Sequence, residues 1–185
     1  MEFTGFHGTD SLNVKSIKEN NFNSSQEDDE WLGYGIYFFL EGISSATESA
    51  ELWAKAEAWN NTTKSFDYNE FSVISVVVNS DAVIDLRVED DLKAFNMVRN
   101  VMYRTHDTHF DPDKRHEHDR VIINLVVKYM EMDVVLSNLF IGSSFIRRKR
   151  IMSKIPNVTV MCVRNNEKID ISTLKIIKEG RVDEH

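Results

Sequence analysis

WLGYGIYFF, at residues 31–39, is the most informative stretch of this chain, and HGT, at residues 7–9, is the second. In the longer stretch, β-forming aromatic and branched residues follow two glycines, which predicts a strand at residues 35–39. In the shorter one, a glycine follows His7 at the expected end of a strand at residues 2–7. A backbone without Cβ can lie directly against a flat ligand, so HGT indicates a place where a planar group can approach the main chain.

Around these two stretches the pattern alternates between helices and strands. Asp10 or Ser11 can cap a helix that runs to about Asn20, with Leu12 and Ile17 among its inward-facing candidates. A capping box of Ser45 and Glu48 opens a second helix that runs to about residue 59. Residues 71–78, FSVISVVV, are apolar on both faces, which is typical of a central buried strand.

The rest of the chain adds two helices and further strands. Helical spacing of apolar residues predicts helices at 91–104 and 118–130, and strands are expected at 82–86, 133–140, 158–164 and 169–177. The predicted class is therefore α+β. We expect a single domain over residues 1–185, with a flexible tail at about 178–185.

Composition limits the setting of the protein. The chain has 185 residues, 42% of them apolar, which suffices for one substantial core. Cys162 is the only cysteine, and the first residues show no signal-peptide pattern, so a reducing cytoplasm is expected. No apolar stretch approaches the roughly 20 residues that cross a bilayer, and no membrane partner is expected. The net charge of −8 argues against general nucleic-acid binding.

HGT, a short helix and GIYF, in this order, resemble the nicotinamide-binding core of the ADP-ribosyltransferases. The likeness is greatest to the His-Tyr-Glu branch, which includes the poly(ADP-ribose) polymerases and small bacterial ADP-ribosylating toxins and whose motifs read HG[ST] and GxGIYF. It covers residues 2–59 and implies an α+β fold with a central split β-sheet flanked by helices. It also implies an enzyme that uses NAD as co-substrate and needs no metal.

The resemblance assigns roles to five residues near the two motifs. It implies that Gly8 offers main-chain hydrogen bonds to the nicotinamide carboxamide, that His7 holds a ribose hydroxyl, and that Thr9 fills the small polar position. Tyr37 would stack on the nicotinamide ring, and Ser45 would bond the carboxamide. The polymerases have a second tyrosine three positions after that serine, but this chain has Glu48 there, so the pocket departs from theirs.

The third residue of the family pattern, commonly a glutamate on a late strand, has no clear counterpart. Related small bacterial proteins resemble QIxVRN at this strand, whereas this chain reads VMCVRN, with Val160 in place of the glutamine. Glu70, in YNEFSVIS, mimics a polymerase signature and is our candidate. It lies, however, on the strand that directly follows the helix after Tyr37, and not on a late strand. Glu131, Asp133 and Glu167 are the other acids near late strands.

The function implied by the resemblance is mono-ADP-ribosyl transfer from NAD to a macromolecular acceptor. Nucleic acid, RNA included, is slightly favoured over protein, and a bacterial toxin or phage-defence effector with an antitoxin or inhibitor as partner is expected. Two alternatives stay open: an NAD glycohydrolase, and a catalytically inactive module that binds NAD or a partner.

Two clusters outside the motifs allow other contacts. The basic run Arg147, Arg148, Lys149 and Arg150 can contact nucleic-acid phosphates, although such runs are more often solvated faces. HxxH and HxH spacings can bind zinc, but without cysteines or rigid helical pairs a solvated loop is favoured over a metal site. The histidines concerned are His106, His109, His116 and His118. The acidic segment 27–30 is expected to be exposed beside the cleft.

Overall fold

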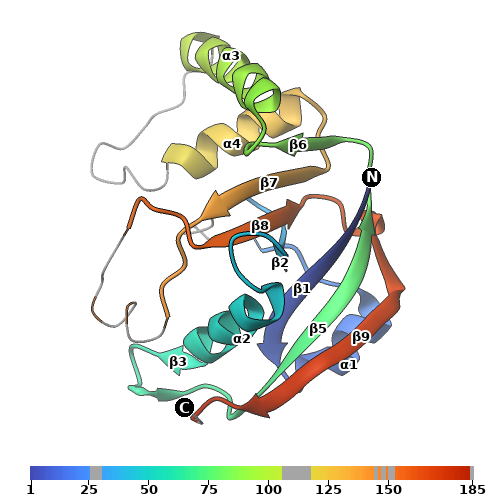
Figure 1. Ribbon diagram of the computed structural model, residues 1–185, viewed down its shortest axis with the longest axis vertical. Helices are drawn as coiled ribbons and strands as arrows, with labels where there is room; N and C mark the ends of the chain where they lie inside the picture. The colour runs from blue at the N-terminus through green and yellow to red at the C-terminus, as the bar shows by residue number, and fades with distance from the viewer. Residues whose placement is uncertain (26–30, 106–117, 144–145, 147–148, 150–152, 184–185) are drawn as a thin grey trace.

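The structure is a computed structural model, and it describes residues 1–25, 31–105, 118–143, 146, 149 and 153–183. In this part of the chain, strands form one seven-stranded sheet in the order β6-β7-β8-β2-β1-β5-β9 (Figure 1). The strands are β1 (Glu2–Asp10), β2 (Ile36–Leu40), β5 (Glu70–Asn79), β6 (Val83–Asp85), β7 (Val134–Leu139), β8 (Val158–Val163) and β9 (Ile169–Arg181). A small hairpin, β3 (Trp59–Asn60) and β4 (Ser65–Phe66), forms a separate sheet.

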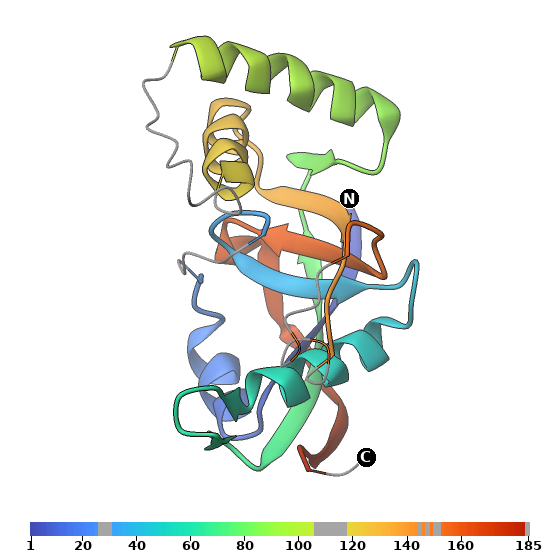
Figure 2. The ribbon, with the colours of Figure 1, turned by 90° about the vertical axis from the view of Figure 1, so that its left-hand side faces the viewer.

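The large sheet is split between β1 and β2. β5 pairs with β1 along its whole length, from Glu2 opposite Asn79 to Asp10 opposite Phe71. β1 and β2, in contrast, share the single pair Phe6 and Phe39. In Figure 2 the half with β2, β7 and β8 runs across the view, whereas β5 runs steeply along it. The predicted α+β class with a split central sheet is therefore confirmed.

Helices flank both halves of the sheet, as expected. They are α1 (Asn13–Asn20), α2 (Ala46–Glu57), α3 (Glu89–Thr105) and α4 (His118–Tyr129), followed late in the chain by the 3-10 turn η2 (Asn166–Lys168). No helix in the described ranges is both long and apolar enough to cross a membrane.

The sheet separates two apolar cores, and β5 supplies both. Phe71 and Val73 pack into the core that contains α2 and α4, whereas Ile74, Val76 and Val78 pack into the core under α1. Successive strand residues point to opposite faces, so a strand with two covered faces must be apolar throughout. The sequence prediction of a central buried strand at residues 71–78 is thus confirmed.

α2 lies very close to β1 because both elements carry small residues where they meet. Ala46, Ala50 and Ala54 are completely buried, and a Cβ placed on Gly8 would lie 1.9 Å from the main-chain oxygen of Ala50. At the start of the helix, the Ser45 hydroxyl accepts a hydrogen bond from the Glu48 amide at 3.3 Å, as the capping box predicts. Any side chain at residue 8 would therefore push α2 off the sheet.

Several expected boundaries are wrong. β1 continues to Asp10, so HGT lies inside the strand rather than at its end. α1 begins at Asn13 without a side-chain cap, and Leu12 is 85% exposed rather than inward-facing. The tail expected from residue 178 is wrong at least as far as Val182: β9 pairs with β5 up to Arg181, and Val182 is buried.

Candidate functional site

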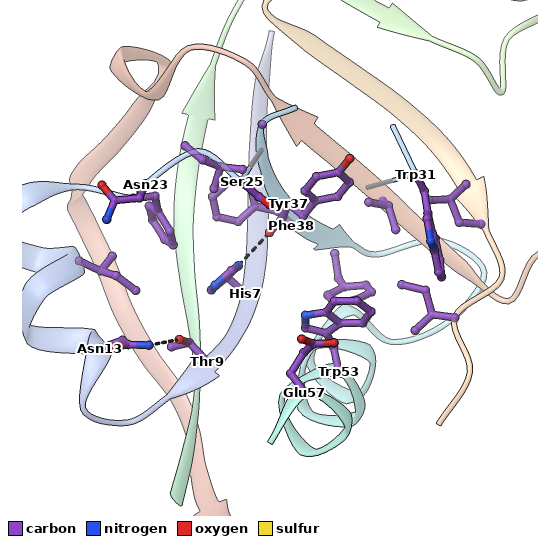
Figure 3. A pocket seen from close by; sticks show the side chains of 18 of the residues that line it. His7, Thr9, Asn13, Asn23, Ser25, Trp31, Tyr37, Phe38, Trp53 and Glu57 are labelled. Carbon is purple, nitrogen blue, oxygen red and sulfur yellow. Dashed lines mark hydrogen bonds between the residues drawn. The ribbon is translucent and has the colours of Figure 1, made fainter. Parts of the chain in front are cut away.

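A cleft of about 770 Å³ lies where the two halves of the sheet meet. Its walls come from β1, α1 and the segment after it on one side, and from β2, α2 and residues 139–142 on the other. Figure 3 shows His7 and Tyr37 between two chemically different ends. One end carries amides and hydroxyls, among them Thr9, Asn13 and Asn23, and the other carries Trp31, Trp53 and Glu57.

His7 joins the two halves of the sheet through its side chain. Continued beyond Phe6 and Phe39, the antiparallel ladder would place His7 opposite Phe38 and then Gly8 opposite Tyr37. Instead, the Nδ1 atom of His7 lies 2.9 Å from the Tyr37 carbonyl oxygen. Because a carbonyl only accepts hydrogen bonds, Nδ1 must carry the hydrogen.

The environment of His7 favours its neutral form. Burial lowers the pKa of the imidazole, and the hydrogen bond to the Tyr37 carbonyl raises it in part. The edges of the Phe22 and Phe38 rings approach the imidazole, with centroids 5.2 and 5.9 Å away. With the hydrogen on Nδ1, the neutral ring carries its lone pair on Nε2, which can accept a hydrogen bond from a ligand hydroxyl.

Tyr37 is fixed through its hydroxyl group. The hydroxyl donates to the Gly33 carbonyl at 2.5 Å and accepts from the Leu32 amide at 2.9 Å. Since both bonds go to the main chain just before β2, the hydroxyl serves to hold the ring in place. Tyr37 lines the cleft, so what it offers a ligand is an oriented aromatic ring.

The structure brings together three of the five residues expected near the motifs. His7, Thr9 and Tyr37 all line the cleft, and the Thr9 hydroxyl accepts a hydrogen bond from the Asn13 side-chain Nδ2 atom at 3.2 Å. Gly8 and Ser45 are not among the described residues that line it. The side-chain position of Gly8 faces α2, because strand residues alternate between faces, and Ser45 serves to cap α2.

The structure does not place Glu70 in the cleft. This side chain is exposed at the start of β5, opposite Arg181. Its strand position lies four residues from Ile74, the partner of His7, which corresponds to about 13 Å along the strand. The position of Glu70 therefore gives no support to its role as the third catalytic residue, which stays a prediction, and its strand is not the late strand of the family pattern, as the sequence order already indicated.

Val160, at the place read as the family's glutamine, does line the cleft, opposite Phe39 of β2. The other late acids do not: Glu131 and Glu167 are absent from the described lining, and Asp133 pairs with Lys168 at 3.3 Å. The late strand thus brings an apolar side chain where a carboxylate or amide was sought.

Glu57 is the acidic side chain that sequence reasoning missed. It is the last residue of α2, is exposed, and is the only carboxylate among the described residues that line the cleft. It follows Trp53, another cleft residue, by one helical turn, so the two share a helix face. That spacing was the available signal, but only the position of α2 on the sheet shows that the face borders the cleft.

Most of the remaining expectations fall outside the described residues. These are Arg147, Arg148 and Arg150 of the basic run, the acidic segment 27–30, and His106, His109 and His116. Lys149 is described and is exposed; His118 begins α4, but its side chain lies outside the described part. Among the side chains that are described, no group of three or more His, Cys, Asp or Glu could hold a metal ion.

Comparison with known proteins gives one distant likeness. No family model matches this chain, and no curated protein matches it. One solved structure, the MbcT-MbcA toxin-antitoxin complex of M. tuberculosis, aligns over 98% of this chain and 84% of its own chain, with a TM-score of 0.44 and 10% sequence identity. At this level of similarity no residue role passes from that complex to this protein.

Proposed function

We propose that the cleft binds NAD and that the protein is a mono-ADP-ribosyltransferase acting on a macromolecular acceptor. The observation that carries the proposal is that His7 and Tyr37, from two separate motifs, both line one cleft at the split in the sheet, where the His7 Nδ1 atom lies 2.9 Å from the Tyr37 main-chain oxygen. The cleft volume of about 770 Å³ lies within the roughly 300–1,000 Å³ typical of small-molecule sites.

The chain's own residues match the parts of this substrate. The Tyr37 ring, held through its hydroxyl, offers a flat face to the nicotinamide ring. His7 presents Nε2 as an acceptor for a ribose hydroxyl. No lysine or arginine is among the described residues that line the cleft, so its amides and hydroxyls would hold the diphosphate by neutral hydrogen bonds. The expected main-chain contacts of Gly8 stay a prediction.

The reaction exchanges one bond at the ribose C1′ atom. The bond to the nicotinamide nitrogen breaks, and nicotinamide leaves as a neutral molecule with the electron pair. A bond to an acceptor oxygen or nitrogen forms, and the acceptor's proton is released. Because the sugar is cationic in the transition state, a fixed negative charge close to it lowers the barrier.

We propose Glu57 for this electrostatic role in place of Glu70. Glu57 ends α2, so its carboxylate lies at the helix terminus that carries the negative end of the dipole. In Figure 3 its carboxylate lies beside Trp53, on the cleft side of α2. The two negative contributions act together on a cation between this helix end and the Tyr37 ring.

The test is incubation of the purified protein with NAD labelled in its adenylate part, with and without bacterial RNA and protein. Nicotinamide release with label in a macromolecule is the expected result. Free labelled ADP-ribose alone would assign the chain as an NAD glycohydrolase. NAD binding by calorimetry without nicotinamide release would assign a binding module, and the absence of both would overturn the proposal.

Variants at the two motifs make the test specific to the cleft. Tyr37→Ala and His7→Ala each remove a group proposed to position the substrate, so nicotinamide release should fall about 100-fold or more in both. Thermal unfolding of each variant checks that the fold is retained. Unchanged turnover in either folded variant would remove the assignment of that residue.

The role as a toxin or defence effector is proposed from the sequence resemblance. Expression of the active protein in bacteria should arrest growth, whereas Tyr37→Ala should not. Growth arrest that persists in this variant would separate the toxic effect from the cleft. An antitoxin or inhibitor is expected to suppress the arrest.

A further inference from the structure

The turn before β2 has unusual backbone geometry and a close neighbour. Gly33 has a φ of +79°, a conformation that favours glycine. A Cβ at this position would lie 2.1 Å from the side-chain oxygen of Asn124, on α4. The turn and α4 therefore fit together only because residue 33 lacks a side chain.

Side chains make hydrogen bonds to several main-chain groups of this turn. The amide of Tyr34 donates to the side-chain oxygen of Asn124 at 3.0 Å. The guanidinium of Arg164, just after β8, donates to the carbonyls of Leu32 and Tyr34. Arg164 also donates to the same Asn124 oxygen at 2.5 Å, so the two side chains act as a unit. We call Asn124 and Arg164 the turn clamp.

Two further polar groups of the turn are bonded by the Tyr37 hydroxyl. The Tyr37 hydroxyl donates to the Gly33 carbonyl and accepts from the Leu32 amide. Five main-chain groups of residues 32–34 thus connect the clamp to Tyr37 within a few bonds. A change in where the clamp holds the turn changes the tilt of the Tyr37 ring.

Arginine suits this position for a geometric reason. Its planar guanidinium presents two parallel N–H groups, which match two carbonyls two residues apart, whereas a lysine offers a single point charge. The main chain of Arg164 is itself held in place, since its amide donates to the Asp133 carbonyl at 2.7 Å. Neither clamp residue is among the described residues that line the cleft.

We infer that Asn124 and Arg164 are positioning residues for the proposed reaction, acting on the substrate through the turn and the Tyr37 ring. This inference rests on the proposed function. DRVIIN and VRN, late in the sequence, thus have a shared role: they supply the two side chains that hold the motif WLGYG.

The first experiment needs no activity. NMR of the protein with labelled tyrosine rings, with the Tyr37 signals assigned by Tyr37→Phe, is compared between wild type, Arg164→Gln and Arg87→Gln. Arg87 is the matched control, because it pairs with Asp85 away from the turn. Arg164→Gln should move the Tyr37 signals and Arg87→Gln should not. Unmoved Tyr37 signals in a folded Arg164→Gln would overturn the inference, whatever the wild-type activity.

The second experiment uses nicotinamide release. Arg164→Gln and Asn124→Ala should each lower kcat about 10-fold or more, because small misplacements of a positioning group are costly. Arg164→Lys should recover only part of the loss. In a Tyr37→Phe background, where the ring no longer bonds the turn, Arg164→Gln should add little. Additive losses would mean that Arg164 acts by another route.

The controls separate the possible failures. If Arg164→Gln does not fold, Arg164→Lys and Asn124→Ala replace it in both the NMR experiment and the nicotinamide-release experiment. An inactive wild type defeats the proposed function and leaves the NMR result to decide the positioning role. An active wild type with unaffected clamp variants defeats this inference alone.

Discussion

The two sides of the cleft are held in different ways. On the β2 side, Tyr37 is positioned by hydrogen bonds. Its hydroxyl bonds the main chain of the turn at residues 32–34, and Asn124 and Arg164 bond other main-chain groups of the same turn. On the β1 side, the backbone beside His7 is positioned by packing, with α2 seated on Gly8 through buried alanines. Hydrogen bonds fix direction and packing fixes distance, so substitutions on the two sides should fail in different ways.

The largest effect on stability is expected from Gly8→Ala. The new Cβ would overlap the Ala50 oxygen, which is main chain and cannot move without the whole helix. We expect the free energy of unfolding to fall by about 3 kcal/mol, measured by urea denaturation. Gly33→Ala is the matched variant on the hydrogen-bonded side, and it should cost only about 1–2 kcal/mol while it lowers activity in the folded protein. Equal stability losses at the two glycines would contradict the comparison.

The next largest effect concerns Glu57, at the end of the helix that packs on Gly8. Glu57→Gln removes the negative charge but keeps the shape, so kcat for nicotinamide release should fall roughly 10- to 100-fold with KM little changed. Glu48→Gln, at an exposed position on the same helix outside the described lining, is the control and should keep wild-type kcat. A Glu57→Gln enzyme with full kcat would exclude the electrostatic role.

A smaller effect links His7 to pH. Burial lowers the pKa of His7 in the folded state below its ordinary 6.5, so the unfolded state binds the proton more readily. The stability that comes from neutral His7 is complete above about pH 6.5 and is lost as the pH falls towards the folded-state pKa. This loss is at most about 1.4 kcal/mol per pH unit. Urea denaturation from pH 8 to pH 5 should show a steeper loss for wild type than for His7→Gln, and parallel curves would count against a partly buried, neutral imidazole.

The smallest effect is expected at Glu70. Its side chain is exposed, far along β5 from His7 and outside the described cleft lining, so Glu70→Gln should change nicotinamide release by no more than about twofold. A large loss would restore the sequence-based candidate. It would also mean that a side chain outside the described cleft lining reaches the substrate.

Local patterns in the sequence predicted the elements that build the cleft. The capping box at Ser45, the apolar run of β5 and the aromatic run of β2 each reflect a short-range rule of periodicity or capping, and each element formed where expected within a few residues. The split of the sheet was expected from family resemblance instead. His7 and Tyr37 came from motif order, and the structure places both at the cleft.

Other features depend on tertiary approach and could not be read from the sequence. Gly8 was expected to serve the ligand, but its missing side chain makes room for Ala50, which only the seating of α2 reveals. Glu57 was not predicted, because the sequence around it does not show where the end of α2 lies relative to the sheet and the cleft. Glu70 was chosen from a short string, and strand register shows why a short string is insufficient.

The single residue pair between β1 and β2 has a mechanical consequence. Most neighbouring strands of a sheet are joined by several hydrogen-bonded residue pairs, and separating the strands breaks all of these hydrogen bonds. Here one residue pair and one hydrogen bond from the His7 imidazole join β1 to β2, so separating the two half-sheets would break few hydrogen bonds and none within either half. In the proposed function, the dinucleotide would enter the cleft at this gap in the sheet.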